Sequence, residues 1–345
     1  MTFTYNIHNV LKIQSDVQLM NYAFHKYFLS DETDDPDIII RIAKDIEKPK
    51  GLSRHDRWFY GKEGGDLVYY EDNLLGINDK VLVKNIKEKP TEIIVTKSVL
   101  KFTPRSRGSL SDLIEAIIDL KLSKTGFATL HAGTLSKNGL AVVLTGFPNV
   151  GKTLCTLYLL KNGFKYMGDD NGMIDKDGNV YCYPSTSSIG YHDFLKFIEP
   201  DDIGRFRYYM HLLRVLPMRV KIVERLFNYP EIYLPDIKRY GQEDKAKAKV
   251  VCCLEIGEMK IREISREKMV KKIEMINDYS RPRPTQNPFL WIYAYFNTDF
   301  NLHGFVGREE EIISSFLKHC KCFVISCNEK NWGEVLEGVL KDEIS

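Results

Sequence analysis

The sequence predicts an α/β protein whose main sheet mixes parallel and antiparallel strands, preceded by a β-rich N-terminal region. Residues 1–105 contain short β-branched and aromatic runs separated by loop-forming residues. Two apolar runs, 127–136 and 140–145, flank Lys137-Asn138-Gly139, and Asn-Gly between apolar runs is a strong hairpin signal. Strands and helices then alternate toward the C-terminus. We therefore expect a β-rich region over 1–105 and an α/β domain over 106–345.

The first region is expected to consist of short strands without a chemical motif. A helix should follow over Ser109–Leu122, because Leu113, Ile117 and Leu120 recur on one face and Ser109 or Ser111 can cap it. The expected strands are Thr2–Ile7, Ile38–Ile42, Leu67–Tyr70, Val81–Lys84 and Glu92–Val95.

The second region is expected to begin with the hairpin over 127–145. A helix over Thr153–Asn162 should end at Gly163, and a strand over Phe164–Met167 should follow it. A second hairpin is predicted with Asp177-Gly178 as its turn. Further strands are expected at Lys249–Ile256, Leu290–Tyr295 and Cys322–Cys327, and further helices at Ile189–Phe197, Glu309–Lys318 and Trp332–Leu340.

The composition is that of an ordinary globular chain. It has 345 residues, 43% hydrophobic and 28% charged, and a formal net charge of +2, which gives no general attraction to nucleic acid or anionic membranes. No apolar run has the length of a membrane span, and the N-terminus lacks the pattern of a secretory signal. Seven cysteines without a paired framework indicate reduced thiols in a cytoplasmic protein. Cys320, Cys322 and Cys327 fit no common zinc spacing and are expected to be buried thiols.

Residues 146–153 read Gly-Phe-Pro-Asn-Val-Gly-Lys-Thr and match the P-loop pattern G-x-x-x-x-G-K-[ST]. In such a loop, backbone N–H groups point at phosphate oxygens, Lys152 reaches the β- and γ-phosphates, and Thr153 offers its hydroxyl to Mg²⁺. A strand precedes this loop and a helix N-terminus follows it, where the helix dipole favours anions. The motif reads phosphates and not a base, so ATP, GTP and pyrophosphate all stay open as donors. The expected nucleotide contacts are Gly146, Pro148, Asn149, Val150, Gly151, Lys152, Thr153 and Leu154.

Two acidic residues and a histidine are expected beside the loop. Asp169 and Asp170 follow the strand after the P-loop helix, and a strand–helix–strand unit brings the ends of both strands to one edge. One carboxylate could hold Mg²⁺ while the other accepts a proton from an attacking hydroxyl. The pair should titrate as one coupled unit. His131 lies on the strand expected to pair with the P-loop strand, so it is expected to face the γ-phosphate or the substrate.

The segment from His131 to Asp170 resembles the kinase core of the HPr kinase/phosphorylase family, which shares its fold with phosphoenolpyruvate carboxykinase. His131 precedes Gly146 by 15 residues and Asp169 follows it by 23, and both intervals agree with the family. The resemblance implies that Asp169 is the general base and that Asp170 supports the metal. It also implies that Lys152 and Thr153 hold the phosphates and Mg²⁺, and that His131 contacts the transferring phosphoryl group.

The resemblance implies a divergent ATP-dependent kinase that uses Mg²⁺ to move the γ-phosphate to a hydroxyl of a protein, a peptide or a small molecule. Bacterial relatives are often hexamers, so it also implies a homo-oligomer. The glycine-rich signature with a Glu and an Arg, which true HPr kinases carry, is not found between Asp170 and Asp201. Phe147-Pro148-Asn149 stand where the family favours small residues. HPr itself is therefore not the expected acceptor.

Other functions stay open on the sequence alone. The chain could be a nucleotide-dependent regulatory ATPase or switch without an acceptor, a kinase acting on an RNA hydroxyl, a carboxykinase-like lyase, or a degenerate scaffold. The GTPase motif N-K-x-D is absent, and Asp175–Gly178 matches D-x-x-G but is expected to be a hairpin turn. The intact Lys152, Thr153 and Asp169 argue against a degenerate scaffold.

Several basic residues are candidates for acceptor binding. The pairs Arg105 and Arg107, and Arg281 and Arg283, could hold an anionic acceptor, but we expect them to be exposed and solvated. The basic runs at 245–249 and 268–272 are expected to be solvated faces, since few aromatics lie among them. Nucleic acid is therefore not the expected partner.

Overall fold

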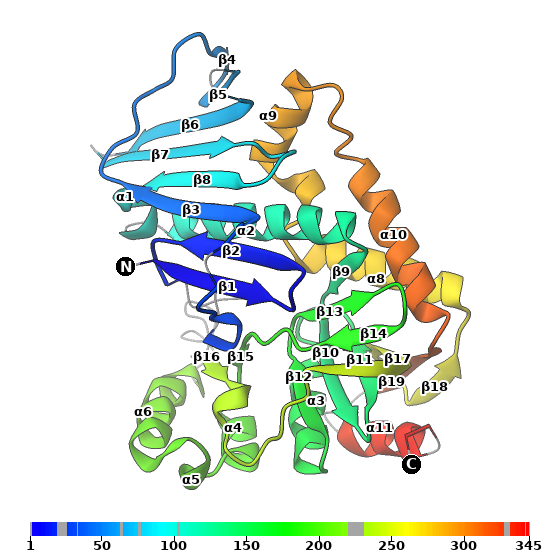
Figure 1. Ribbon diagram of the computed structural model, residues 1–345. Coiled ribbons are helices and arrows are strands. Elements are labelled where there is room, and N and C mark those ends of the chain that lie inside the picture. Colours follow the sequence, from blue (N-terminus) through cyan, green and yellow to red (C-terminus); the bar gives the residue numbers. More distant parts are fainter. Residues whose placement is uncertain are drawn as a thin grey trace. The chain divides into compact units, whose positions relative to one another are not determined.

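A computed structural model shows a chain that divides into two compact units (Figure 1). The first unit comprises Met1–Gly126 and Pro282–Glu309, and the second comprises Phe127–Arg281 and Glu310–Ser345. The structure describes every residue except 1, 19–25, 33, 63–64, 75–76, 102–103, 220–230, 328–331, 342 and 345.

Within the described residues, the first unit contains an eight-stranded sheet in the order β1-β2-β3-β8-β7-β6-β5-β4. Strand β3 lies parallel to β2 and β8, and the other pairs are antiparallel. The five strands predicted here are present; β2, β4 and β5 were missed, and β6 and β7 are longer than predicted. The strands are β1 (Phe3–Ile7), β2 (Leu11–Ser15), β3 (Ile38–Ala43), β4 (Ser53–His55), β5 (Trp58–Gly61), β6 (Leu67–Leu74), β7 (Ile77–Lys84) and β8 (Thr91–Thr96).

Helix α2 is the long helix of the first unit, and Figure 1 shows it running along the sheet. Its apolar side chains at Leu113, Ile117 and Leu120 are buried, as the spacing predicted. It contacts β2 and the short helix η5, so it belongs to this unit, and the division differs from the predicted boundary at residue 105. The unit also contains η2 (Lys26–Phe28), α1 (Lys97–Lys101), α2 (Pro104–Lys124), η5 (Pro284–Gln286) and α9 (Pro288–Phe296).

The prediction of a strand over Leu290–Tyr295 is wrong, because these residues lie in α9. Asn287 caps this helix by accepting a hydrogen bond from the backbone N–H of Phe289, and Pro288 occupies its first position, where proline is favoured. The aromatic and β-branched residues suggested a strand, but the cap and the tertiary contacts select a helix.

Asp66 ties α9 to strand β6. Its carboxylate accepts hydrogen bonds from Tyr60 at 2.9 Å, Tyr293 at 3.1 Å and Asn297 at 2.7 Å. Burial alone would raise the pKa of Asp66, but these hydrogen bonds outweigh it and the pKa is lowered. Tyr60 also stacks on Phe296 with ring centroids 4.9 Å apart. These contacts explain why the segment Pro282–Glu309 returns to the first unit.

The second unit is built on a mixed sheet, as predicted. Its order is β12-β10-β11-β17-β14-β13-β9, and β19 pairs with β17 and β18. Strand β17 lies parallel to both β11 and β19, and the remaining pairs are antiparallel. The strands are β9 (Phe127–Leu130), β10 (Ala132–Lys137), β11 (Leu140–Thr145), β12 (Lys165–Gly168), β13 (Gly172–Asp175), β14 (Asn179–Tyr181), β17 (Lys245–Ile256), β18 (Lys260–Glu263) and β19 (Lys321–Cys327).

The predicted hairpin over 127–145 is present, but its first strand is broken. Strand β10 pairs antiparallel with β11, with Thr134 opposite Val143. Strand β9 pairs with β13 instead. The break falls at His131, which belongs to neither strand. The second hairpin joins β13 and β14, and Asp175 accepts hydrogen bonds from the backbone N–H groups of Asp177 and Asn179. Asp175–Gly178 therefore forms the predicted turn.

Helices cover both faces of this sheet. Helices α3 and α11 share a hydrophobic cluster with side chains of one face, and α8 and α10 share a second cluster with side chains of the other. Helix α8 was missed by the sequence reading. The helices are α3 (Lys152–Lys161), α4 (Tyr191–Phe197), α5 (Pro200–Ile203), α6 (Arg205–Val215), η3 (Leu216–Arg219), η4 (Leu234–Asp236), α8 (Arg266–Ser280), α10 (Gly304–Leu317) and α11 (Trp332–Lys341); a small sheet pairs β15 (Thr186–Ser188) with β16 (Glu231–Tyr233).

Side-chain burial matches some predictions and corrects others. All seven cysteines lie within the described residues, where they are buried and none forms a disulfide. The predicted exposure of Arg281 and Arg283 is wrong, since they are only 8% and 1% exposed. The side chains of Arg105 and Arg107 lie outside the described part. No helix among the described residues is long and apolar enough to cross a membrane.

Candidate functional site

The P-loop leaves the sheet from a central strand of the second unit. Strand β11 lies between β10 and β17 and ends at Thr145, and helix α3 begins at Lys152. Gly151 has φ of 107°, and a Cβ there would lie 2.9 Å from the indole nitrogen of Trp332. A Cβ on Gly146 would lie 2.8 Å from the carbonyl oxygen of Leu254. Both glycines of the motif are therefore required by close packing behind the loop.

The side chain of Lys152 folds back into the P-loop. It is 4% exposed, and Nζ donates hydrogen bonds to the carbonyl oxygens of Gly146 at 2.9 Å and Phe147 at 3.1 Å. Burial lowers its pKa, while the nearby carboxylates of Asp170 and Asp169 act in the opposite direction. The cationic group is thus held at the mouth of the loop by neutral acceptors that an anion could replace.

The remaining predicted loop contacts differ in what they can offer. The side chain of Val150 is buried in the cluster beneath α3, and that of Leu154 packs against the same cluster, so only their backbone N–H groups could reach a phosphate. Asn149 has φ of 64° and is exposed, which fits a tight loop. Pro148 has no N–H to donate. Phe147 is 50% exposed, and its ring meets that of Tyr279 edge-on at 5.3 Å.

Asp169 lies where the sequence predicted it, directly after β12 and beside α3. Strands β11 and β12 both pair antiparallel with β10, so they end at the same edge of the sheet. Oδ2 of Asp169 accepts hydrogen bonds from Thr153 at 3.0 Å and from Ser187 at 2.6 Å, and Oδ1 accepts one from Thr156 at 3.5 Å. The structure therefore brings Thr153 and Asp169 together, and the carboxylate is fully buried.

Gly133 makes room for this arrangement. A Cβ at this position would lie 2.7 Å from Oγ1 of Thr156 and 3.5 Å from Oδ1 of Asp169. The glycine after His131 and Ala132 is thus needed for α3 and Asp169 to approach β10. The sequence reading missed Ser187 as a partner of Asp169, and it missed Ser185, whose hydroxyl donates to the main-chain carbonyl of Asp169.

Asp170 differs from Asp169 in its surroundings. Its backbone has φ of 63°, in the left-handed region that Asp tolerates better than most residues. Burial, and then the charge of Asp169, raise its pKa to about 7, while Lys152 opposes the shift. Unlike Asp169, its side chain is partly exposed. Burial also raises the pKa of Asp169, so the two neighbouring carboxylates titrate as one pair and differ chiefly in that Asp170 is the more exposed.

His131 is held rigidly at the break between β9 and β10. Its backbone N–H donates to Oδ1 of Asn277 at 2.8 Å, and its carbonyl accepts from Thr145 at 3.1 Å. Nδ1 lies 3.1 Å from the carbonyl oxygen of Asp170. Since a carbonyl only accepts, Nδ1 must carry the proton, and Nε2 of the neutral ring presents a lone pair. Among the described residues, Nε2 has no hydrogen-bond partner.

Burial and two neighbouring cations keep the ring of His131 neutral. Burial lowers its pKa to about 3, and the cations of Lys152 and Arg281 add to the effect. Asn277 and Arg281 both come from the C-terminal end of α8, which the sequence reading did not place near the loop. Their four-residue spacing on a helix was the available signal, but nothing in the sequence connects that helix to His131.

The oxygen atoms at this edge suit a hard divalent cation. Oγ1 of Thr153 and the carboxylate of Asp169 are already in contact, and Asp170 follows directly. Mg²⁺ is typically bound through one or two protein oxygens together with phosphates and water. In the described part of the chain, no group of three or more His, Cys, Asp or Glu side chains forms a metal cage. The residues present therefore fit Mg²⁺ bound together with a phosphate ligand.

Comparison with known proteins adds no family to this geometry. No protein-family model matches the chain, and no curated protein is significantly similar to it.

Proposed function

We propose that the second unit is a phosphotransferase domain that binds a nucleoside triphosphate with Mg²⁺ at the P-loop and transfers its γ-phosphate to a hydroxyl. The observation that carries the proposal is the 3.0 Å hydrogen bond between Thr153 and Asp169 at the edge where β11 and β12 both end. It joins the last residue of the P-loop motif to an acidic residue that a separate strand positions. The fold proposed is that of HPr-kinase-like P-loop kinases, because the segment that resembles this family forms the hairpin of β10 and β11, the P-loop, α3 and β12 in succession.

Asp169 and Asp170 are proposed to divide the work in the opposite way from the sequence expectation. Asp169 would hold Mg²⁺ together with Thr153, because its carboxylate is buried and fixed by hydroxyl donors. Asp170 would accept the proton of the attacking hydroxyl, because it is partly exposed and its pKa is raised to about 7. A general base works best when its pKa lies near the working pH.

The remaining groups would stabilise charge during transfer. Lys152 would exchange its two carbonyl partners in the loop for oxygens of the β- and γ-phosphates, and the N–H groups at the start of α3 would receive the phosphate chain. When bound, Mg²⁺ would neutralise charge on the phosphate oxygens. In its neutral form, His131 would accept a hydrogen bond through Nε2, so it would orient the acceptor hydroxyl rather than contact a phosphate oxygen.

The proposal is tested by separating nucleotide binding from transfer. Wild-type protein should bind a non-hydrolysable ATP analogue with Mg²⁺ in calorimetry. Asp170→Asn should bind it with near-wild-type affinity but lose phosphoryl transfer from [γ-³²P]ATP. Thr153→Ala should raise the Mg²⁺ concentration required for half-maximal phosphoryl transfer. Thr153→Ser, which keeps the hydroxyl, should not. Wild-type protein that binds no nucleotide would overturn the proposal, and full turnover by Asp170→Asn would reject that residue as the base.

The acceptor decides between a kinase and a regulatory ATPase. ADP release should accelerate when a serine-containing peptide or a small polyol is added, and label should appear on that compound. Turnover that no hydroxyl compound changes, with all label released as phosphate, would assign the domain to the ATPase or switch class instead.

A further inference from the structure

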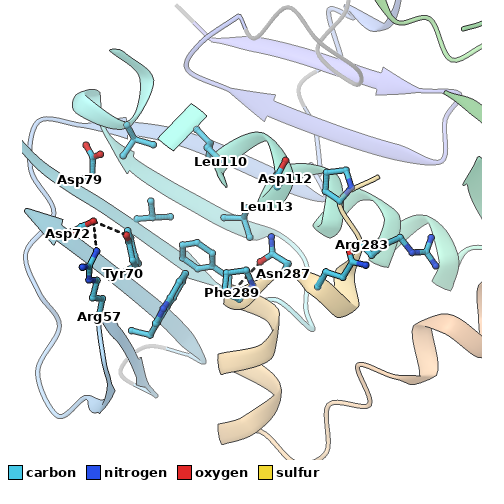
Figure 2. A pocket seen from close by; sticks show the side chains of 16 residues that line it. Arg57, Tyr70, Asp72, Asp79, Leu110, Asp112, Leu113, Arg283, Asn287 and Phe289 are labelled. Carbon is cyan, nitrogen blue, oxygen red and sulfur yellow. Dashed lines mark hydrogen bonds and ion pairs between the residues drawn. The ribbon is translucent and has the colours of Figure 1, made fainter. Parts of the chain in front are cut away.

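A cavity lies wholly within the first unit. Its volume is about 680 Å³, in the range of small-molecule sites. Strands β5, β6 and β7 form one wall, the segment from η5 to the start of α9 forms another, and α2 contributes Asp112 and Leu113 (Figure 2). All of its lining residues belong to the first unit, so the cavity shares no residue with the P-loop site.

Strand register gathers polar and aromatic groups on one face of that wall. Tyr70 and Asp72 are two residues apart on β6, so their side chains point to the same side of the sheet. Trp58 on β5 lies opposite Tyr70, and Asp79 on β7 lies opposite Asp72. Trp58 also contacts Phe289 of α9 edge-on, with ring centroids 4.5 Å apart. The cavity therefore combines aromatic walls with two carboxylates that face each other across a strand pair.

The opposition of Asp72 and Asp79 is unusual. Like charges directly opposite each other on antiparallel strands destabilise the sheet. Asp72 is compensated by Arg57 at 2.7 Å and by the hydroxyl of Tyr70 at 3.3 Å, as the dashed lines in Figure 2 show. Among the described residues, Asp79 has no cationic partner, and its Oδ1 is buried without a hydrogen bond.

The remaining charges of the cavity leave an excess of negative charge. Arg283 is engaged by Glu309 in a buried ion pair, so it does not balance the cavity. Asp112 on α2 is exposed and has no ion-pair partner in the described part of the chain. Figure 2 shows Asp79 on the strand side and Asp112 on the helix side. Asp79 and Asp112 are thus the two acidic groups that the protein itself leaves uncompensated.

We propose that this cavity binds a small organic cation that carries one or two ammonium groups on an apolar stem. The stem would lie against Trp58, Tyr70 and Phe289, because aromatic faces attract ammonium groups as well as alkyl chains. The charged ends would meet Asp79 and Asp112. An inorganic cation does not fit, because the walls offer aromatic rings rather than a cage of oxygen atoms. An anion does not fit, because both basic side chains are already paired.

The test is calorimetric titration of the full chain with 1,4-diaminobutane, n-butylammonium and tetramethylammonium. The neutral analogue 1,4-butanediol and the anion succinate serve as ligand controls. At least one of the cations should bind, and neither control compound should bind at the same concentrations. Asp79→Asn and Asp112→Asn should each weaken that binding about tenfold or more, since each removes a charged partner. Asp34→Asn removes an exposed carboxylate of the same unit outside the cavity and should leave the affinity unchanged.

Two outcomes would overturn the proposal. One is that none of the three cations binds. The other is that Asp34→Asn weakens binding as much as Asp79→Asn, which would indicate only general attraction to a negative surface. Thermal unfolding supplies a second measurement without ligand. Asp79→Asn should melt at a higher temperature than wild type, because it removes the opposition with Asp72. A lower melting temperature would show that Asp79 serves the fold and would overturn its role as a ligand.

Discussion

The P-loop site and the cavity of the first unit are built in different ways. Most of the P-loop site comes from one continuous stretch, residues 131–170, in which a motif and its spacing define the geometry. The cavity is assembled from residues 57–113 and 282–289, and strand register places its key side chains opposite each other. A short motif can be read directly from a sequence, whereas opposed residues become visible only when strand pairing is known.

The two sites should also differ in which interactions stabilise them. Substitution of Arg283 should give the largest change in the free energy of unfolding. Arg283 is 1% exposed and paired with Glu309. Arg283→Met should destabilise the first unit by about 3–5 kcal/mol, because it leaves a buried carboxylate without its partner. Hydrogen exchange should show that backbone amides lose protection in β6–β8 and keep it in β10–β12. The double variant Arg283→Met/Glu309→Leu should recover most of the stability. Equal loss in the double variant would show that packing, not charge, is what Arg283 contributes.

Lys152→Ala should separate the two sites by function. Phosphoryl transfer should fall by about 10²–10³-fold, the typical cost of removing one group that stabilises transition-state charge. Binding of organic cations to the first unit should not change. Lys161→Ala, at the exposed C-terminal end of the same helix, is the matched control and should retain transfer. Comparable losses in both variants would mean that the assay reports the fold of α3 rather than the chemistry of Lys152.

The sequence predicted the mixed α/β class and much of the second unit. The hairpin at Asn138-Gly139 and the helix after the P-loop were predictable because turn residues and periodicity are local signals. Leu290–Tyr295 was misread because aromatic and β-branched residues favour strands in general. Its helix depends on the Asn287 cap and on contacts with Tyr60 and Asp66, which lie more than 200 residues earlier in the chain.

In the candidate site, too, the contacts between residues near in sequence were predictable and the long-range contacts were not. Thr153 and Asp169 were expected together and are together, because the strand–helix–strand unit between them is short. The break at His131 and the role of Asn277 were not predictable from the sequence. They depend on contacts between α8 and the end of β9, where the Asn277 side chain bonds the backbone of Thr129 and His131. The burial of Arg283 was not predictable, because its partner Glu309 lies 26 residues away in α10. The opposition of Asp72 and Asp79 required the register of β6 and β7.

Gly133→Ala tests how tightly the P-loop site is packed, with a smaller expected effect. The new methyl group would lie 2.7 Å from Oγ1 of Thr156, so the helix or Asp169 must shift. We expect a loss of about 1–3 kcal/mol in the free energy of unfolding and a higher Mg²⁺ requirement for turnover. Gly257→Ala, where a Cβ meets only Ser326 at 3.8 Å, is the control and should change neither. Wild-type Mg²⁺ dependence in Gly133→Ala would show that Asp169 tolerates displacement.

The pH dependence of stability distinguishes Asp170 of the P-loop site from Asp66 of the first unit. The folded-state pKa of Asp170 is raised to about 7 from its ordinary value of 3.8, so the folded protein binds a proton that the unfolded chain has lost. Between these values, its contribution to stability therefore falls as pH rises. His131, whose pKa is lowered to about 3 from 6.5, has the opposite slope over most of this range, so the wild-type profile partly cancels.

Comparing Asp170→Asn with wild type removes this cancellation, because both proteins keep His131. The free energy of unfolding of the variant minus that of wild type should increase by about 1.4 kcal/mol for each unit of rising pH between roughly pH 5 and 6.5. Asp66→Asn, which removes a carboxylate whose pKa is lowered by its hydrogen bonds, should show no such gain over the same range, because Asp66 is ionised there in both the folded and the unfolded state. Urea unfolding at closely spaced pH values measures both differences. A flat difference for Asp170→Asn would mean that this carboxylate is already ionised at pH 5, and the case for Asp170 as the proton acceptor would then fail.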